Sequence, residues 1–350
     1  EFPLSELIKY SPYINRDDRQ FLKEMNLLTK NHYDGCREYR ALLGNFREAK
    51  TIEELLFLHV GLFKLFDLKT ENKNVTHTRV LFSSSTIGIP SRIQLDKLSS
   101  RFQNQSTAAI LKDYLGVEKR PLLVIDSLKS LLKRSEISAR IAAAMSLKPF
   151  ANKILFILEN PEDPKSMKWK EIHECLESNE DLIVYGFSWI LWLAWCNQEF
   201  PQDVRKALKG KRIYFVHSGG WKKIESKNVN KETFDKALLN DLHPNSKVID
   251  YYGLVEQIGV IFPLCEYGYR HVPVWSDVIV RESISMKSIN GEPGQLQLMN
   301  TLAHGAPYHN VLTEDLALIA PGQCECGRIS KKFKLLGRVP NIEIRGCANV

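Results

Sequence analysis

The sequence has no apolar run long enough to cross a membrane as a helix. Its longest strongly apolar stretch, 182–195, has fourteen residues and includes Tyr185 and Ser188, whereas a membrane span needs about 20 residues. A buried segment of a folded protein is the better interpretation. The chain starts EFPL, which is not the basic and then apolar start of a signal peptide. These absences predict a cytoplasmic protein without a membrane span.

Cysteine is scarce, and the positive charge is neither large nor clustered. Seven cysteines in 350 residues are too few for a dense disulfide framework, and their number is odd. They therefore predict free thiols or metal ligands. The net charge of +7 is modest, and the sequence has no zinc-finger spacing, RNA-binding signature or long basic tail. We therefore expect a small anionic partner such as a nucleotide, and no nucleic acid.

The order of helix-like and strand-like segments indicates the fold class. Apolar residues recur at helical spacing in the first 75 residues, for example at Phe21, Met25 and Leu28 and again over 55–62. Short β-rich runs follow at 79–82, 122–125, 154–157, 212–216, 248–251, 278–280 and 295–299. Helix-like segments such as 126–133 and 233–239 separate several of them. This alternation predicts an α/β protein with a mostly parallel sheet, a helical N-terminal region and a smaller β-rich subregion in the last third.

The most distinctive local pattern is a hydroxyl-rich loop after a predicted strand. The run 82–91 reads FSSSTIGIPS, with four consecutive hydroxyl residues and then a glycine. Side-chain and backbone donors in such a loop can wrap a polyphosphate, and glycine permits close approach of the backbone. Ordinary turn chemistry gives similar patterns. The loop lacks the Gly-Lys-Ser/Thr ending of a Walker loop, so that class of phosphate site is excluded.

Two more patterns follow in order along the chain. The run DYYGLVE at 250–256 ends a predicted strand, where a tyrosine can stack on a purine and Glu256 can hold a magnesium ion. Further on, the carboxylate of Asp315 can accept hydrogen bonds from both ribose hydroxyls, and Arg338 can donate to ribose or phosphate. Each residue alone also fits an ordinary surface position. The order of the motifs is therefore the stronger signal.

Taken in this order, the motifs resemble those of the adenylate-forming superfamily of acyl ligases, over roughly residues 76–345. Within the superfamily, the chain most resembles the acyl-protein synthetases of bacterial luminescence fatty-acid reductase complexes, with phenylacetate-CoA ligases as the next relatives. The segments LLTKNHYDGCREY at 27–39 and VHSGGWK at 216–222 carry the same resemblance. The family implies ATP and Mg²⁺ as cofactors and a carboxylic acid as substrate.

The resemblance also implies a role for each matching residue. The hydroxyl-rich loop would hold the ATP phosphates, and Asp315 would bind the ribose. Gly219 and Gly220 would bring the backbone against the adenine, and Tyr252 would stack on it. Glu256 would bind magnesium, and Arg338 would contact the ribose and the developing acyl phosphate. The nucleotide-binding residues implied in this way are Ser83, Ser84, Ser85, Thr86, Gly88, Gly219, Gly220, Tyr252, Gly253 and Asp315.

Three positions depart from the superfamily pattern. Ser85 stands where glycine is usual, no lysine follows Pro90, and Val255 replaces a threonine. These departures keep open the alternative of a noncatalytic nucleotide-binding module.

Four cysteine and histidine residues have a spacing that suits a metal. Cys265 and His271 come from one segment, and Cys324 and Cys326 from another, which is enough for a closed Cys3His zinc site. The alternative is two unrelated turn cysteines. Phenylacetate-CoA ligases resemble this layout, so we expect structural zinc that stabilises a β-rich subregion around 260–335.

Near its end, the chain matches the luminescence synthetases in a second way. Adenylate-forming enzymes usually continue past the Gly-Arg motif into a small C-terminal domain with a catalytic lysine. We expect this domain to be absent here. In the synthetases, a cysteine near the C terminus takes the acyl group as a thioester. Cys347 matches that role, since Arg345 nearby favours the thiolate and a flexible end can carry the acyl group. A harmless exposed thiol is the alternative.

The predicted function is ATP-dependent activation of a carboxylic acid, most simply a fatty acid, to acyl-AMP. The acyl group then passes to Cys347 and on to a partner such as an acyl reductase or a carrier. An acyl- or aryl-CoA ligase, or an adenylase that loads a carrier directly, is the alternative enzyme. The predicted organisation is a helical region at 1–75, an adenylate-forming core at 76–337 and a short tail at 338–350.

Overall fold

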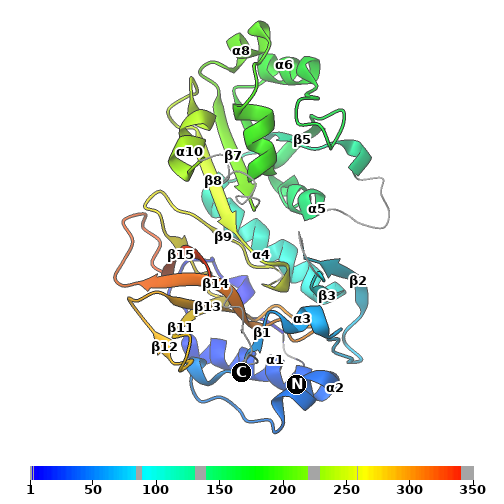
Figure 1. Ribbon diagram of the computed structural model, residues 1–350, viewed down its shortest axis with the longest axis vertical. Helices are drawn as coiled ribbons and strands as arrows, with labels where there is room; N and C mark the ends of the chain where they lie inside the picture. The colour runs from blue at the N-terminus through cyan, green and yellow to red at the C-terminus, as the bar shows by residue number, and fades with distance from the viewer. Residues whose placement is uncertain are drawn as a thin grey trace, which may run out of the picture. The chain divides into compact units, whose positions relative to one another are not determined.

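The chain divides into two compact units. A computed structural model describes residues 2, 4–83, 89–130, 139–219, 229–257 and 259–339. The first unit takes the described residues of Glu1–Gln103, Leu254–Val260 and Cys265–Val350, and the second takes those of Asn104–Gly253 and Ile261–Leu264 (Figure 1). This division follows other boundaries than the predicted segments 1–75, 76–337 and 338–350, and that subdivision stays a prediction.

The second unit is built on a six-stranded sheet with the order β5-β4-β6-β7-β8-β9. Neighbouring strands are parallel except for the last pair, β8 and β9. The mostly parallel sheet predicted from the sequence is therefore confirmed. The strands are β4 (Arg120–Val124), β5 (Ala151–Phe156), β6 (Asp181–Phe187), β7 (Arg212–Ser218), β8 (Lys247–Tyr252) and β9 (Phe262–Pro263).

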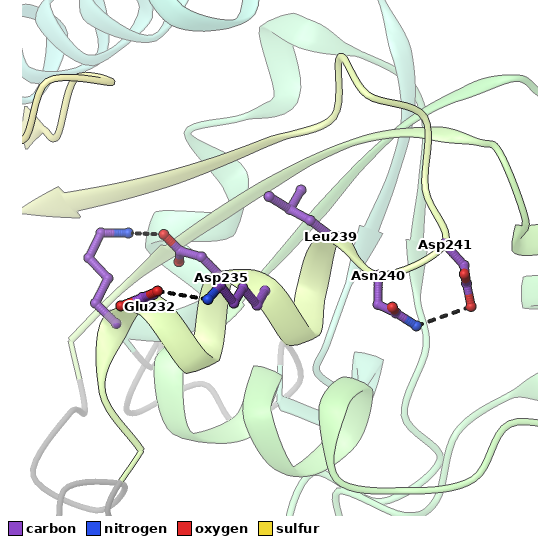
Figure 2. Close-up of a pocket in the computed structure, with 7 residues that line it drawn as sticks. Glu232, Asp235, Leu239, Asn240 and Asp241 are labelled. Atoms are coloured by element: carbon purple, nitrogen blue, oxygen red, sulfur yellow. Dashed lines mark hydrogen bonds and ion pairs between the residues drawn. The ribbon is translucent and has the colours of Figure 1, made fainter.

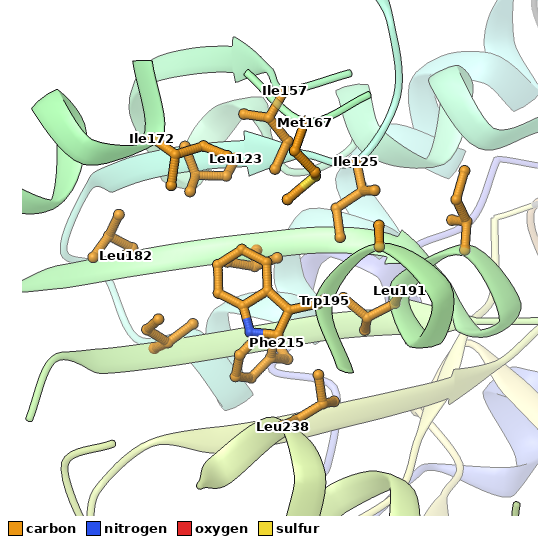
Figure 3. Close-up of a cluster of buried hydrophobic side chains, with 14 of the residues drawn as sticks. Leu123, Ile125, Ile157, Met167, Ile172, Leu182, Leu191, Trp195, Phe215 and Leu238 are labelled. Carbon is orange, nitrogen blue, oxygen red and sulfur yellow. The ribbon is translucent and has the colours of Figure 1, made fainter. Parts of the chain in front are cut away.

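Both faces of this sheet are buried, as parallel strands require. Consecutive residues of a strand point to opposite faces, so Leu123 joins one hydrophobic core and Leu122 the other. In the first core, Trp195 packs edge-on against Phe215, with ring centroids 5.7 Å apart (Figure 3). The helical segments of this unit are η3 (Leu128–Ser130), α5 (Ala139–Met145), η4 (Lys148–Phe150), α6 (Trp169–Ser178), α7 (Ser188–Leu191), η5 (Trp192–Cys196), α8 (Gln202–Leu208) and α10 (Lys231–Leu239).

The apolar stretch 182–195 is buried, as predicted, but it is not one element. It forms the end of β6, then α7, and then the π-helical turn η5. The predicted helix at 233–239 is confirmed as α10. Of the predicted helix at 126–133, the structure describes the short turn η3, and residues 131–138 lie outside the described part of the chain.

The first unit contains a seven-stranded sheet with the order β10-β15-β14-β13-β11-β12, in which β1 also pairs with β14. Its strands are antiparallel except for the β1–β14 pair. This sheet is the predicted β-rich region of the last third. Its strands are β1 (Leu58–His59), β10 (Arg270–His271), β11 (Ser276–Arg281), β12 (Ser288–Ile289), β13 (Gly294–Asn300), β14 (Asn310–Ala320) and β15 (Lys332–Arg338).

The first unit also holds the helices of the N-terminal region and a two-stranded sheet. Helix α1 begins after Asp17, whose carboxylate accepts hydrogen bonds from two backbone N–H groups of the first turn. The predicted apolar positions Phe21, Met25 and Leu28 are buried on one face of this helix. The elements are η1 (Leu7–Lys9), α1 (Asp18–Gly35), α2 (Arg37–Leu43), η2 (Ile52–Glu54), α3 (Leu62–Leu65), β2 (His77–Phe82) and β3 (Arg92–Asp96), with α4 (Lys97–Leu115) spanning the boundary between the units.

The helical pattern predicted over 55–62 is wrong. Residues 58 and 59 form strand β1, and Leu58 pairs with Val311 of β14. Leu58 and Val311 are both buried in the core of this unit. Pairing with a distant strand therefore overrides the local helical spacing. Within the described part of the chain, no helix combines the length and the apolar character that a membrane crossing requires.

Candidate active-site residues and metal cluster

The hydroxyl-rich loop joins two antiparallel strands. The backbone N–H of Ser83 donates to the carbonyl of Ser91 over 3.1 Å, and the N–H of Ser91 donates to Oγ of Ser83 over 2.9 Å. These two serines therefore close the base of the loop after β2, where the sequence predicted it. The other loop residues with a predicted phosphate role lie outside the described residues: Ser84, Ser85, Thr86 and Gly88.

Two predicted adenine-side residues lie at the ends of neighbouring strands of the second unit. Gly219 comes directly after β7, and Tyr252 is the last residue of β8. Because β7 and β8 are adjacent and parallel, these positions share the carboxyl edge of the sheet, where ligands bind in open α/β folds. Gly219 has a φ of 62°, which favours glycine. Gly220 lies outside the described residues.

Tyr252 is half-buried and leads into Gly253 at the start of the turn to the next element. Its ring lies 6.2 Å from that of Phe262 on β9, in a tilted arrangement. Strand β9 pairs with this end of β8, so Phe262 supports the tyrosine ring from a neighbouring strand. An aromatic ring held in this way is a suitable surface for a purine.

Glu256 belongs to the first unit and is 6% exposed, in the short helical turn η6 (Val255–Gln257). The next residue anchors this turn: Nε2 of Gln257 donates to the carbonyl of Tyr308 over 2.6 Å, and Nδ2 of Asn300 donates to Oε1 of Gln257 over 3.0 Å. Sequence analysis missed Gln257 and Asn300. A glutamine directly after the predicted magnesium ligand was the only local signal for them.

The structure brings Asp315 and Arg338 together. They are opposite each other on β14 and β15, and Nε of Arg338 lies 3.8 Å from Oδ1 of Asp315. The Arg338 side chain is 60% exposed, so it is accessible to a ligand. A carboxylate can accept hydrogen bonds from ribose hydroxyls, and an accessible guanidinium beside it can donate to phosphate at the same place.

The backbone next to Arg338 is irregular. Gly337 has a φ of 126°, and the β14–β15 register shifts between Leu316 and Ala317. A bulge of this kind re-aims the side chains that follow it, and its φ suits only glycine. The Gly-Arg motif thus has a local structural reason, because the bulge sets the register in which Arg338 faces Asp315.

The four predicted metal ligands form one cluster in the first unit. The ligand atoms of Cys265, His271, Cys324 and Cys326 all lie within 4.8 Å of one another. The Cys265 and Cys324 sulfurs are 3.8 Å apart, and Cys326 Sγ is 3.2 Å from Nε2 of His271. Two sulfurs bound to a tetrahedral zinc at about 2.3 Å would lie about 3.8 Å apart. The donor set and its spacing therefore fit zinc.

Two similar turns present the cysteines of this cluster. The Gly268 N–H donates to the Cys265 carbonyl over 2.9 Å, and the Gly327 N–H donates to the Cys324 carbonyl over 3.1 Å. Both glycines have a positive φ, which lets the chain reverse three residues after each cysteine. His271 comes from β10, which pairs with β15 beside the second turn.

The electrostatics of two members of the cluster, His271 and Cys326, suit metal binding. Burial, with help from the charges of Arg328 and Lys332, lowers the pKa of His271 to about 4, so the imidazole is neutral at pH 7. Burial raises the pKa of the Cys324 thiol. Burial would also raise the pKa of the Cys326 thiol, but its hydrogen bonds with Arg328 and Cys324 and the charge of Arg328 outweigh burial and lower it. Zinc binds the neutral imidazole and the thiolate, so the low pKa of His271 and the lowered pKa of Cys326 both favour binding.

A hollow of about 710 Å³ beside α10 does not resemble a nucleotide site (Figure 2). Its charged side chains pair along the helix, Lys231 with Asp235 and Lys236 with Glu232. With Asp241, it has three acids and two lysines, a formal charge of −1 that does not favour a polyphosphate. None of the predicted site residues lines it.

Comparisons with known proteins find ligases that are similar to this chain. A long-chain-fatty-acid–luciferin-component ligase from Vibrio harveyi is 21% identical over 325 residues, covering 91% of this chain and 83% of the relative. A structure of 2-hydroxyisobutyryl-CoA ligase in an open conformation has a TM-score of 0.69 at 13% identity, covering 99% of this chain and 84% of the other. The same ligase in a postadenylation state gives a TM-score of 0.66 at 13% identity, covering 97% and 74%.

The structural likeness confirms the predicted fold class, the α/β fold of an adenylate-forming ligase. The family model "Acyl-protein synthetase, LuxE" matches residues 7–350, which is nearly the whole chain. The resemblance seen in the motifs is thereby confirmed, and the chain belongs to the LuxE family of acyl-protein synthetases.

Proposed function

We propose that this ligase activates a long-chain fatty acid with ATP and Mg²⁺ and passes the acyl group to a partner protein through Cys347. The acid class follows the name of the Vibrio harveyi relative. The observation that carries the proposal is the Asp315–Arg338 pair in a chain of this family. The pair places a hydrogen-bond acceptor for ribose hydroxyls beside a hydrogen-bond donor for phosphate.

In the first step, a carboxylate oxygen of the acid attacks the α-phosphorus of ATP. The new oxygen–phosphorus bond gives acyl-AMP, and the bond from the α-phosphorus to its bridging oxygen breaks to release pyrophosphate. Arg338 neutralises charge that develops on the phosphate, and Asp315 holds the ribose. Glu256 would hold the magnesium ion, whose charge offsets that of the leaving pyrophosphate.

In the second step, the Cys347 thiolate attacks the acyl carbonyl. The bond between the carbonyl carbon and the phosphate oxygen breaks, and AMP leaves with the electron pair. A thiol of the acyl-accepting protein, such as a reductase or a carrier, then exchanges with the Cys347 thioester. Cys347 lies outside the described residues, so its role rests on the family and on its sequence position.

Zinc in the cysteine–histidine cluster would have a structural role. Its four ligands come from the protein, which leaves no open position for a substrate. Bound there, the metal would join the 265–271 segment to the 324–326 turn and so stabilise the β15 side of the sheet.

Two measurements test this function together. Acid-dependent exchange of labelled pyrophosphate into ATP, over a panel of fatty and aryl acids, tests formation of acyl-AMP. Intact-mass analysis of the wild type and of Cys347→Ala tests the thioester. We expect exchange with long-chain acids and a hydroxylamine-labile adduct that disappears in the variant.

The matched control is Cys196→Ala, because burial raises the pKa of the Cys196 thiol to about 12 and makes it a poor nucleophile. This variant should keep the adduct. Exchange without an adduct would instead indicate a ligase that acylates CoA or a carrier thiol directly. Failure of every acid to support exchange would indicate a noncatalytic nucleotide-binding module.

A further inference from the structure

A buried hydrogen bond joins the carboxyl ends of two neighbouring strands in the second unit. Oγ of Ser188 lies 2.8 Å from Nδ1 of His217, and both side chains are fully buried. Ser188 is the first residue of α7, directly after β6, and His217 is the last residue but one of β7. Since β6 and β7 are parallel and Gly186 pairs with His217, the bond fixes the two strand ends relative to each other.

The same imidazole also contacts α10, the next helix after β7 in the described part of the chain. The rings of His217 and Phe234 have centroids 4.9 Å apart, and Phe234 is fully buried on α10. Helix α10 starts after Asn230, whose side chain accepts a hydrogen bond from the Thr233 N–H. His217 thus contacts two helices, Ser188 of α7 through one ring nitrogen and Phe234 of α10 through its ring.

The Ser188–His217 pair restricts orientation in a way that an apolar pair would not, because a hydrogen bond depends on direction. The side chains around it belong to a hydrophobic core that includes Ile190, Leu191 and Phe234. Apolar residues of similar volume would fill this space, and replacing both hydrogen-bonding partners by apolar groups is often nearly neutral for stability. A hydrogen bond between two buried groups, however, fixes one orientation of the imidazole and so of the strand that carries it.

We propose that Ser188 and His217 are positioning residues for ATP binding. By fixing the end of β7, they set where Ser218 and Gly219 leave the sheet, and Gly219 already has the positive φ of a tight turn. Neither side chain touches the nucleotide; both act through the backbone of Ser218 and Gly219. The inference rests on the proposed function, because it takes Gly219 as an adenine-side residue.

The test compares Ser188→Ala, which removes the hydrogen bond and leaves the His217–Phe234 contact, with Ser188→Thr, which keeps a hydroxyl. The matched control is Thr70→Ala, because Oγ1 of Thr70 makes a similar buried bond of 2.7 Å to Nδ1 of His32 in the first unit. Each protein is examined by calorimetric titration with Mg²⁺–ATP, by thermal unfolding and by backbone hydrogen exchange.

We expect Ser188→Ala to bind ATP about fivefold to tenfold more weakly, the effect of one lost buried hydrogen bond. Ser188→Thr should recover most of this affinity. Thr70→Ala should lower the unfolding temperature and yet bind ATP within about twofold of the wild type, since a loss of stability alone at this level leaves the protein folded. Amide exchange at Ser218 and Gly219 should rise in Ser188→Ala more than exchange at Ile213 and Tyr214.

The outcomes separate the two claims. If the unaltered protein does not bind ATP, the proposed function fails, and the nucleotide role of the pair fails with it. If the unaltered protein binds ATP but Ser188→Ala matches it in affinity and in exchange at Ser218 and Gly219, the positioning role alone is overturned. Equal weakening in Ser188→Ala and Thr70→Ala would also overturn it, because the effect would then follow from general destabilisation.

Discussion

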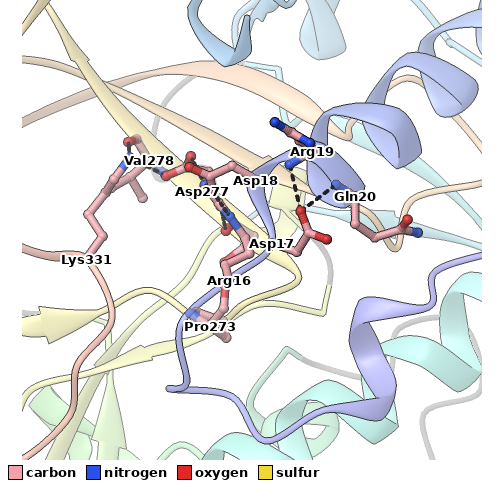
Figure 4. Close-up of polar contacts among 10 residues, drawn as sticks. Arg16, Asp17, Asp18, Arg19, Gln20, Pro273, Asp277, Val278 and Lys331 are labelled. Atoms are coloured by element: carbon pink, nitrogen blue, oxygen red, sulfur yellow. Dashed lines mark hydrogen bonds and ion pairs between the residues drawn. The ribbon is translucent and has the colours of Figure 1, made fainter.

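Arg16 and Asp277 form a largely buried ion pair although they lie 261 positions apart in the sequence, with Nη2 of Arg16 2.7 Å from Oδ2 of Asp277 (Figure 4). Nη1 of Arg16 also donates to the Ser276 carbonyl, and Nζ of Lys331 lies 2.5 Å from Oδ1 of Asp277. Burial alone would raise the pKa of Asp277, but the charges of Lys331 and Arg16 hold it below its ordinary value. The pair attaches the segment before α1 to strand β11.

Replacing Arg16 by methionine should destabilise the first unit strongly. Asp277 is 1% exposed, so the change leaves a buried carboxylate with one cation instead of two. Breaking a buried pair from one side typically costs about 3 kcal/mol or more. Urea unfolding measures the loss. The control Arg19→Met, at an exposed position of the same helix region, should change the free energy of unfolding by less than about 0.5 kcal/mol; equal losses would contradict the importance of the pair.

The stability of the first unit should fall steeply below pH 6.5 because of a buried histidine pair. His32 and His309 are both buried, with ring centroids 4.7 Å apart. Burial lowers the pKa of His309 to about 3 and that of His32 well below its ordinary value. The unfolded chain therefore takes up protons near pH 6.5 that the folded chain does not, so acid favours unfolding. Each histidine should contribute a loss of up to about 1.4 kcal/mol per pH unit.

The variant His309→Gln tests this directly. The amide can keep the bond that Nε2 of His309 makes with Oγ1 of Thr29, but it does not titrate. Denaturant unfolding between pH 7 and pH 5 should show a shallower pH dependence than in the wild type. His59→Gln, at an exposed position, should leave the slope unchanged. An unchanged slope in His309→Gln would assign the acid sensitivity to other groups.

The fold class was predictable because the core follows local sequence patterns. In the second unit, short β-rich runs and amphipathic helices alternate, and both kinds of pattern survive in β4, β5, β7, β8 and α10. Strand β1 was not predictable, because two residues become a strand only by pairing with β14. The change from β6 to α7 was also missed, because a single glycine, Gly186, inside one apolar run does not show by itself where a strand ends.

The candidate site was predictable where the residue type limits the chemistry. Cysteine and histidine are rare, so the spacing of four of them indicated one cluster, which the structure brings together. Arg16 and Asp277 were not predictable, because charged residues are common and nothing local joins positions so far apart. The Ser188–His217 bond was hidden for a similar reason, since it depends on the register of two parallel strands.

The cysteine–histidine cluster should bind one zinc ion per chain. Metal analysis of the full chain, purified without chelators, should find zinc in the wild type and less than half as much in Cys324→Ser and His271→Ala. Cys175→Ser removes a buried thiol outside the cluster and should retain the metal. Chelation should lower the unfolding temperature of the wild type and not that of Cys324→Ser, because metal binding stabilises only a chain that holds the ion. A wild type free of zinc would remove the structural metal from the proposal.

Asp315→Asn should weaken ATP binding more than the matched change next to it. The substitution removes the negative charge of the carboxylate that we propose accepts hydrogen bonds from the ribose hydroxyls, and hydrogen bonds to a charged group contribute about 1.5–3 kcal/mol. We expect the KM for ATP to rise about 10- to 100-fold. Neighbouring residues on a strand point to opposite faces, so Glu314→Gln on β14 should change this KM by less than about twofold. Equal effects would mean that the general charge of β14 matters and a specific ribose contact does not.

Gly337→Ala should lower the rate of pyrophosphate exchange although no atom obstructs the new methyl group. A Cβ at Gly337 would have nothing within 4 Å, so the effect comes from the φ of 126°, which alanine disfavours. Relaxing that strain rotates the backbone just before Arg338 and moves the guanidinium away from Asp315. We expect the exchange rate to fall about tenfold or more, since a misplacement of about 1 Å at a reacting centre can lower the rate a hundredfold.

Gly322→Ala is the matched control, because Gly322 has a φ of 70° and equally open surroundings but lies in the turn after β14. It should lose a similar amount of stability and keep its exchange activity; if Gly322→Ala lost activity to the same extent, the backbone at Gly337 would have no special part in placing Arg338.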